Sequence, residues 1–191
     1  MIEKFDYTLA KFAASLRENF GAVLTPVFKA ITLSGTIGAI FIIAAIVLII
    51  FRKTRRAGIT AGVALLYGLL ITNILLKNIV ARPRPYADET SVYFGFWQNA
   101  GSMKESRFSF PSGHSTASTA FAVALFIVFN KKYSWAFLFI PLIMGFTRIY
   151  FVVHYASDVI GGFLAGTIAA IGSYFTVKAL SKFERIKKFL S

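Results

Sequence analysis

The sequence contains no cysteine, and only two of its 191 residues are histidines, His114 and His154. Without cysteine the chain has no disulfides, no thiol chemistry and no cysteine-based metal site. A zinc site would have to recruit carboxylates, but the eight Asp and Glu residues are few and scattered. We therefore expect neither a bound metal nor a cofactor.

Charge is also scarce, because 15% of the residues are charged and 57% are hydrophobic. An ordinary soluble domain contains fewer apolar residues. The net charge of +13 could indicate a nucleic-acid partner. However, the Lys and Arg residues lie between long apolar runs and do not collect on one soluble face, which is typical of membrane proteins. We expect the lipid bilayer as a partner, and no nucleic acid.

Five apolar runs carry almost no charge. Each is close to the ~20 residues that a helix needs to cross ~30 Å of hydrocarbon. One such run could be a buried core helix, but five could not all be buried in 191 residues. We predict an all-α, polytopic membrane helix bundle formed by a single domain, 1–191, with about five transmembrane helices. The runs are 30–51, 57–76, 112–129, 133–153 and 159–177.

The N-terminal segment, 1–29, has a different pattern, with large apolar residues at helical spacing. This spacing predicts an amphipathic helix lying in the membrane interface. A helix that packs on the protein from the soluble side is the alternative. The acidic residues of segment 1–29 interrupt the apolar core that a signal peptide needs, so we do not expect a signal peptide. The apolar stripe consists of Phe5, Leu9, Phe12, Leu16 and Phe20.

Basic residues in the short connections predict the orientation. If the five runs alternate in direction, three basic groups fall on one side, which is then cytoplasmic. The opposite side holds the N-terminal helix, the polar loop 77–110 and the turn at His154. We therefore expect a multi-pass protein of the plasma or inner membrane with an extracytoplasmic site. The groups are Arg52, Lys53, Arg55 and Arg56; Lys131 and Lys132; and Lys178, Lys182, Arg185, Lys187 and Lys188.

The first of three polar clusters on that side pairs Lys77 with Arg84, seven residues later. Arginine grips a phosphate through two parallel N–H bonds, and lysine acts as a point charge. Alone, the pair could equally be two basic side chains that reach for the membrane surface. Arg82 could be a further phosphate contact or an anchor to lipid headgroups.

The second cluster is Pro111-Ser112-Gly113-His114, at the start of the third run. Proline suits the first helical position, and the free N–H groups of Ser112 and Gly113 would then face an anion at a helix N-terminus. Ser112 adds a hydroxyl, and His114 lies within reach of the same anion. A simple helix start would give the same four residues.

The third cluster contains Arg148, His154 and Asp158. A charged residue such as Arg148 inside an apolar run is costly, which makes it a functional candidate. A carboxylate four residues after His154 could bond one ring nitrogen and leave the other as a nucleophile. The alternative is a helix-stabilising pair, worth only a few tenths of a kcal/mol. Together, two histidines, three cations and a helix N-terminus on one membrane face suit a bound phosphoryl group.

The three clusters resemble the signature motifs of the type 2 phosphatidic acid phosphatase family, the lipid phosphate phosphatases. The matching segments are Lys77-x6-Arg84-Pro85, Pro111-Ser112-Gly113-His114 and Arg148-x5-His154-x3-Asp158. The superfamily includes bacterial undecaprenyl-diphosphatases and phosphatidylglycerophosphatases. One position departs from the family pattern, because Thr147 stands where serine is usual; its hydroxyl is retained.

The resemblance implies a role for each motif residue. His154 attacks phosphorus and forms a phosphohistidine, Asp158 orients His154, and His114 protonates the leaving oxygen. Phosphate-binding residues hold the remaining oxygens, and water, activated by His114, hydrolyses the intermediate. The implied phosphate-binding residues are Lys77, Arg84, Ser112, Gly113 and Arg148.

We therefore expect a metal-independent lipid phosphatase or diphosphatase, with undecaprenyl diphosphate as the first choice of substrate. Phosphatidylglycerophosphate and phosphatidic acid are the alternatives. A vanadium haloperoxidase shares the site but is normally soluble, which the apolar runs oppose. A non-catalytic lipid transporter or scaffold is more remote, because every motif residue is present. The oligomeric state is not predicted.

Overall fold

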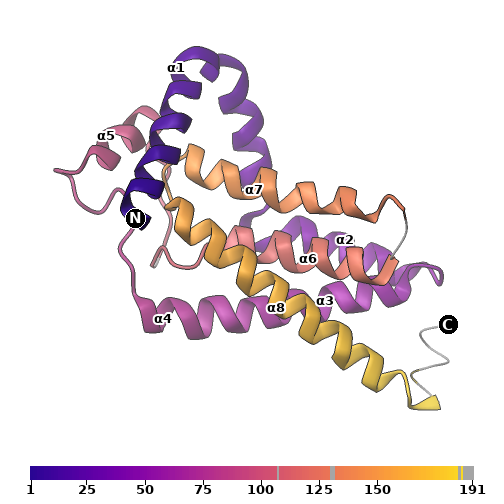
Figure 1. Cartoon of the computed structure of the whole chain (residues 1–191). Helices are drawn as coiled ribbons and strands as arrows, with labels where there is room; N and C mark the ends of the chain where they lie inside the picture. Colours follow the sequence, from indigo (N-terminus) through magenta and orange to yellow (C-terminus); the bar gives the residue numbers. More distant parts are fainter. Residues whose placement is uncertain (107, 130–131, 185, 187–191) are drawn as a thin grey trace.

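The computed structural model describes residues 1–106, 108–129, 132–184 and 186, and within these ranges every regular element is a helix (Figure 1). The predicted all-α class is confirmed. Four of the basic residues used to predict the orientation lie outside the described residues: Lys131, Arg185, Lys187 and Lys188.

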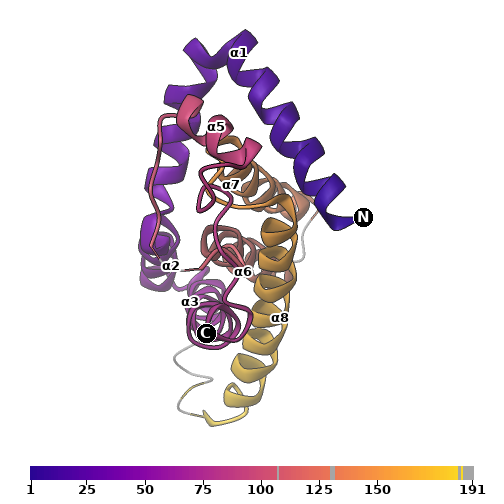
Figure 2. The same ribbon diagram turned by 90° about the vertical axis from the view of Figure 1, so that its left-hand side faces the viewer.

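The chain forms a bundle in which helices α3, α6, α7 and α8 pack together, while α1 and α5 cover one end (Figures 1 and 2). Short 3₁₀ or π segments connect or extend several helices. The helices are α1 (Ile2–Ser34), α2 (Ala39–Ile50), α3 (Arg55–Leu69), α4 (Lys77–Val80), α5 (Val92–Asn99), α6 (Gly113–Phe129), α7 (Phe139–Tyr150) and α8 (Ala156–Leu180). The short segments are η1 (Thr36–Gly38), η2 (Leu70–Leu76) and η3 (Ser134–Leu138).

Two helices of the described chain are long and apolar enough to cross a membrane: Arg55–Val80, which joins α3, η2 and α4, and Ala156–Leu180. A third span results if α1 and α2 count as one bent unit. The apolar helices Gly113–Phe129 and Ser134–Tyr150 are shorter. The predicted number of five transmembrane helices therefore stays a prediction.

The prediction of one continuous helix over 30–51 is wrong, because α1 ends at Ser34 and α2 starts at Ala39, bent by 58°. Two glycines make the break possible. Gly38 has φ +73°, a conformation that side chains oppose. A Cβ on Gly35 would lie 2.6 Å from Cε of Met144 and 3.1 Å from Cδ2 of His114. Gly35 thus lets the chain pass close to a residue of the second motif.

The N-terminal helix turns its small residues and the two leucines of its apolar stripe toward the protein, while the phenylalanines of the stripe are exposed. Phe5, Phe12 and Phe20 are 39%, 52% and 60% exposed. The buried positions of α1 are Asp6, Ala10, Ala13, Ala14 and Thr32. Small residues allow close helix approach where lipid solvates the large ones. Leu9 and Leu16 of the same stripe pack against the protein, and the Phe12 ring lies 6.3 Å from that of Phe146. The placement of α1 in the membrane interface stays a prediction, and α1 extends beyond residue 29 to Ser34.

Helix α6 occupies the centre of the bundle, between α3, α7 and α8 (Figure 2). Small residues line its contact with α8, where Gly162 and Gly166 meet its backbone. A Cβ on Gly166 would lie 2.6 Å from the Thr116 carbonyl oxygen and 2.6 Å from Cβ of Thr119. Because α6 and α8 carry motif residues at their N-terminal ends, this close packing fixes the two histidine segments relative to each other.

Replacing Gly166 with alanine is expected to destabilise the folded protein by about 1–3 kcal/mol, because the backbone of α6 cannot move aside as a flexible side chain would. Thermal unfolding in detergent measures the effect. Gly172 on the same helix is the matched control, since its added Cβ would lie at an ordinary 3.5 Å from Tyr67. Equal stability of the two alanine variants would contradict the packing argument.

Candidate active site

A cavity of about 720 Å³ opens between helices α2, α3 and α6 and reaches the loop before α6. Its polar end contains residues from all three motifs. Its other end is apolar and runs along α2 and α3. The polar lining includes Lys77, Arg84, Glu105, His114 and His154. The apolar lining includes Ile42, Ala45, Ile46, Ile49, Leu65, Leu66 and Leu69. Most of the predicted site thus converges on one chamber.

The turn between α7 and α8 presents His154, which is 4% exposed. The backbone N–H groups of Val153 and His154 both donate to the Arg148 carbonyl, at 3.2 and 3.4 Å. Val152 in the same turn has φ +53°, a strained conformation for a β-branched residue. Such strain persists only where the surrounding structure over-determines it. The turn therefore holds the histidine in a fixed place.

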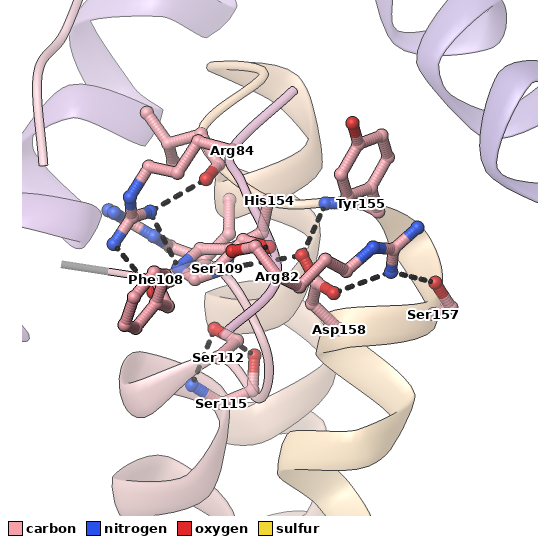
Figure 3. Close-up of polar contacts among 12 residues, drawn as sticks. Arg82, Arg84, Phe108, Ser109, Ser112, Ser115, His154, Tyr155, Ser157 and Asp158 are labelled. Atoms are coloured by element: carbon pink, nitrogen blue, oxygen red, sulfur yellow. Dashed lines mark hydrogen bonds and ion pairs between the residues drawn. The ribbon is translucent and has the colours of Figure 1, made fainter. Parts of the chain in front are cut away.

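Asp158 and Arg84 lie on opposite sides of the His154 ring (Figure 3). Nδ1 lies 3.5 Å from Oδ2 of Asp158, and Nε2 lies 3.3 Å from Nη1 of Arg84. The guanidinium can only donate, so Nε2 carries the lone pair and Nδ1 carries the proton. This tautomer leaves a lone pair on Nε2, beside the cavity.

Burial lowers the pKa of His154 well below its ordinary value of 6.5, and the nearby Arg84, Arg148 and Lys77 lower it further. Each cation makes a second positive charge on the ring unfavourable. The imidazole is therefore neutral near pH 7, as a nucleophile must be.

His114 is the second residue of α6 and faces the same cavity. Within the described part of the chain its buried Nε2 has no hydrogen-bond partner. The ring also has a hydrogen bond to the Thr32 backbone. A buried ring nitrogen without a partner is costly unless a ligand completes it, so Nε2 is suited to exchange a proton with a molecule in the cavity.

The second motif is divided between the cavity and the helix cap. Gly113 lines the cavity, as expected. The Ser112 hydroxyl is fully buried and accepts hydrogen bonds from the Ser115 hydroxyl at 3.0 Å and the Ser115 N–H at 3.4 Å. Ser112 thus caps the first turn of α6 (Figure 3), and its side chain lies behind the cavity lining.

Arg148 is 1% exposed and pairs with Glu105, which stands between it and the cavity. A second bond joins Arg148 to the Thr32 hydroxyl of α1. Burial tends to raise the pKa of Glu105, but Arg148 and His114 outweigh it and hold the pKa below its usual range. Glu105 is therefore ionised and paired with Arg148, the arginine to which the family motif assigns phosphate binding.

Arg82 does not line the cavity but bonds Asp158, the carboxylate next to His154. Its Nη1 donates to Oδ1 of Asp158 at 2.7 Å, and its Nη2 donates to Oδ2 of Asp6 at 2.9 Å (Figure 3 shows the Asp158 bond). Arg82 therefore bonds two carboxylates inside the protein, and does not make the phosphate contact or headgroup anchor suggested from the sequence. The Thr147 hydroxyl bonds the Met144 carbonyl within α7.

Sequence reasoning missed Asp6, Thr32 and Glu105. Each lies outside the three motifs, and only the three-dimensional fold brings it into contact with a motif residue or its partner. Glu105 had one available signal: it is an acidic residue in the loop between two cationic motifs on the same membrane side. Asp6 had a weaker one, since it shares a helix face with Ala10, Ala13 and Arg17.

The family model described as the PAP2 superfamily matches residues 57–182. This range contains all three motifs and most of the cavity wall. The chain belongs to the PAP2 superfamily.

Individual relatives are phosphatases by name. The chain is 30% identical to the undecaprenyl-diphosphatase BcrC of Bacillus subtilis over 147 residues, which cover 77% of this chain and 72% of the relative. It is 29% identical to an undecaprenyl-diphosphatase of Sulfolobus acidocaldarius, covering 63% of this chain and 55% of the relative. It is 31% identical to phosphatidylglycerophosphatase B of Bacillus subtilis, covering 62% and 55%. The matches thus span only about half the length of the last two.

A solved structure shares the fold. It is the crystal structure of a transmembrane PAP2 type phosphatidylglycerolphosphate phosphatase from Bacillus subtilis. The TM-score is 0.67 at 22% identity, with 96% of this chain and 89% of the other covered.

Proposed function

We propose that this protein is an integral membrane lipid phosphatase that cleaves a lipid phosphate or diphosphate through a phosphohistidine on His154. The observation that carries the proposal is one cavity with a cationic, histidine-containing end and a long apolar end. The cationic end suits a phosphoryl group, and the apolar end suits a hydrocarbon chain.

In the first step, the lone pair on Nε2 of His154 attacks phosphorus. A P–N bond forms, the bond from phosphorus to the leaving oxygen breaks, and that oxygen takes a proton from Nε2 of His114. Lys77, Arg84 and the Gly113 N–H, which line the cavity, hold the other oxygens, and Arg148 joins them when the phosphate takes the place of Glu105 beside it. The Asp158 carboxylate, 3.5 Å from Nδ1, stabilises the positive ring that forms.

In the second step, water attacks phosphorus and gives its proton to His114. The P–N bond breaks, its electron pair returns to Nε2, and inorganic phosphate leaves. The protein's own cations supply all the positive charge that these two steps need, so the reaction requires no metal.

Undecaprenyl diphosphate is the proposed substrate, on the extracytoplasmic face of the membrane. Two relatives bear the name undecaprenyl-diphosphatase, and BcrC is aligned over most of both chains. The extracytoplasmic placement rests on the basic residues in the connections opposite the site, such as Arg52, Lys53 and Arg56.

Phosphate release from a panel of lipids by the purified protein in excess chelator tests the function. The panel contains undecaprenyl diphosphate, phosphatidylglycerophosphate and phosphatidic acid, with His154→Ala as the blank. We expect release in chelator, fastest from the polyprenyl diphosphate. Equal rates on all three would contradict the substrate, and strict dependence on Mg²⁺ would contradict the metal-free site. Lipid binding or movement without any hydrolysis would favour a transporter.

Filling the apolar end of the cavity is expected to weaken lipid binding selectively. Gly62 on α3 lines this end, and an added Cβ there meets nothing within 4 Å. Gly62→Leu should raise KM for the long-chain substrate about tenfold, because about two methylene contacts are lost. Rates on a short, water-soluble phosphate ester should not change. Gly62→Ala, which adds only one methyl group, is the control; an equal KM in both variants would exclude the tail from this groove.

The pH profile should be limited on both sides. The lowered pKa keeps His154 neutral, so activity should fall on the acid side only below the ordinary imidazole value of 6.5. On the alkaline side kcat should fall as His114, in the complex with the anionic substrate, loses the proton that it donates. Steady-state rates between about pH 5 and about pH 9 measure this. A flat profile, or an alkaline limit that survives in His114→Ala, would contradict the roles of the two histidines.

A further inference from the structure

Asp6, near the start of α1, is connected to the catalytic pair although no motif contains it. Its side chain is 1% exposed. Oδ1 accepts from the Ser157 N–H at 2.7 Å, and Oδ2 accepts from the Ser157 hydroxyl at 2.8 Å and from Arg82 at 2.9 Å. Because Ser157 is in the first turn of α8, Asp6 joins α1 to the helix that carries Asp158.

The Arg82 guanidinium is shared between two carboxylates. Nη1 bonds Oδ1 of Asp158 and the Ser157 hydroxyl, both at 2.7 Å, and Nη2 bonds Asp6. The cation also lies 3.8 Å above the ring of Tyr155. Arginine usually grips one carboxylate with two parallel bonds. Here Asp6 takes the second bond, so only one oxygen of Asp158 is used by Arg82.

The other oxygen of Asp158 faces the nucleophile. Oδ2 accepts from the Tyr155 N–H at 2.9 Å and lies 3.5 Å from Nδ1 of His154. Were Arg82 to turn both donors onto Asp158, it would compete for this oxygen. The sharing of the cation therefore leaves Oδ2 facing Nδ1, the ring nitrogen that carries the proton.

The same sharing sets the charge behind the ring. One cation between two carboxylates leaves a net charge of about −1 next to His154, whereas the Arg82–Asp158 pair alone would be neutral. When the ring becomes positive on accepting phosphorus, a net negative charge stabilises it and a neutral pair does so much less.

We propose that Asp6 is a positioning residue of the active site: it holds Arg82 so that Asp158 keeps one oxygen and one net negative charge for His154. The N-terminal helix is then part of the catalytic machinery. The inference rests on the proposed function, because it takes His154 as the nucleophile.

Asp6→Asn tests it with little change of shape, since the amide oxygen can still accept from the Ser157 N–H. Losing a charge-assisted hydrogen bond should lower kcat about 10- to 100-fold. KM should stay within about threefold, because Asp6 lies behind the site and does not contact substrate. Glu18→Gln, on the exposed side of the same helix, removes the same charge and should keep the wild-type kcat.

Both parameters are measured by phosphate release from a lipid phosphate in detergent, with His154→Ala alongside. The inference is overturned if Asp6→Asn has the wild-type kcat, or if Glu18→Gln loses kcat to the same extent. In either case an inactive His154→Ala leaves the proposed function intact. An active His154→Ala overturns the proposed function itself. If Asp6→Asn does not accumulate in the membrane, two variants of Arg82 replace it in the test. Arg82→Lys retains the cation and should have a kcat at least about tenfold higher than that of Arg82→Gln. Equal losses of kcat in the two variants overturn the inference.

Discussion

Replacing His154 with alanine is expected to reduce phosphate release by about 10⁴-fold or more, because it removes the atom that attacks phosphorus. The ring lies 3.3 Å from Arg84 and 3.5 Å from Asp158, and water in the resulting space would lack both the nucleophilicity and the fixed position of Nε2. Initial rates with a lipid phosphate, compared with the wild type at equal amounts of folded protein, measure the loss.

His114→Ala gives a matched comparison, because it removes the proton donor and leaves the nucleophile. Its loss should be smaller for a diphosphate, whose leaving group needs a proton less, than for a monoester. The His154 variant should fail on both substrates alike. If His154→Ala retained most of its activity, or discriminated between the two substrates as His114→Ala does, His154 would not be the nucleophile.

Replacing Arg148 with methionine is expected to reduce activity about 10³-fold, since a buried arginine that stabilises transferred phosphoryl charge has effects of this order. The structure adds a second consequence. Glu105 would lose its partner, so the folded protein should also be less stable. Steady-state kinetics and thermal unfolding in detergent separate the two effects.

The double variant Arg148→Met with Glu105→Gln separates charge imbalance from catalysis. Without the uncompensated carboxylate, stability should recover in large part, while activity should stay low because the phosphate-binding cation is still absent. Recovery of activity together with stability would show that Arg148 is only a structural partner of Glu105.

The sequence was sufficient to name most residues of the candidate site, because charged and ionisable residues are conspicuous inside or beside apolar runs. Arg148 stands out in an apolar run, and Asp158 follows His154 by four residues, although His154 lies in the turn before α8 and not on the helix. The structure brings Lys77, Arg84, Gly113, His114 and His154 to one cavity, with Arg148 and Asp158 directly behind its wall.

What the sequence did not reveal depends on side chains that meet only in three dimensions. The Ser112 hydroxyl could face a phosphate or cap its own helix, and only the structure shows that it accepts from Ser115 in the cap; its predicted bond to phosphate stays a prediction. Asp6 is one acidic residue among several in α1, and its value comes from Arg82 and Ser157, which are far away in the chain.

The helix boundaries failed for a related reason. By hydropathy, residues 30–51 form one apolar run, because glycine does not interrupt such a run. The break at residues 35–38 follows from the close approach of Gly35 to Met144 and His114, which is a tertiary contact. Likewise, the apolar stripe of α1 was visible in sequence, but only the structure shows that its leucines and the neighbouring small residues pack on the protein while its phenylalanines are exposed.

The most direct test of the central claim is a rapid-quench experiment with a lipid substrate labelled in its transferred phosphate. The quench is kept alkaline, because phosphohistidine is labile in acid. The account predicts label on the wild-type protein during turnover, more label on His114→Ala, where hydrolysis of the intermediate is slowed, and none on His154→Ala. Steady phosphate release without label on the wild type or on His114→Ala would contradict it and indicate direct attack by water.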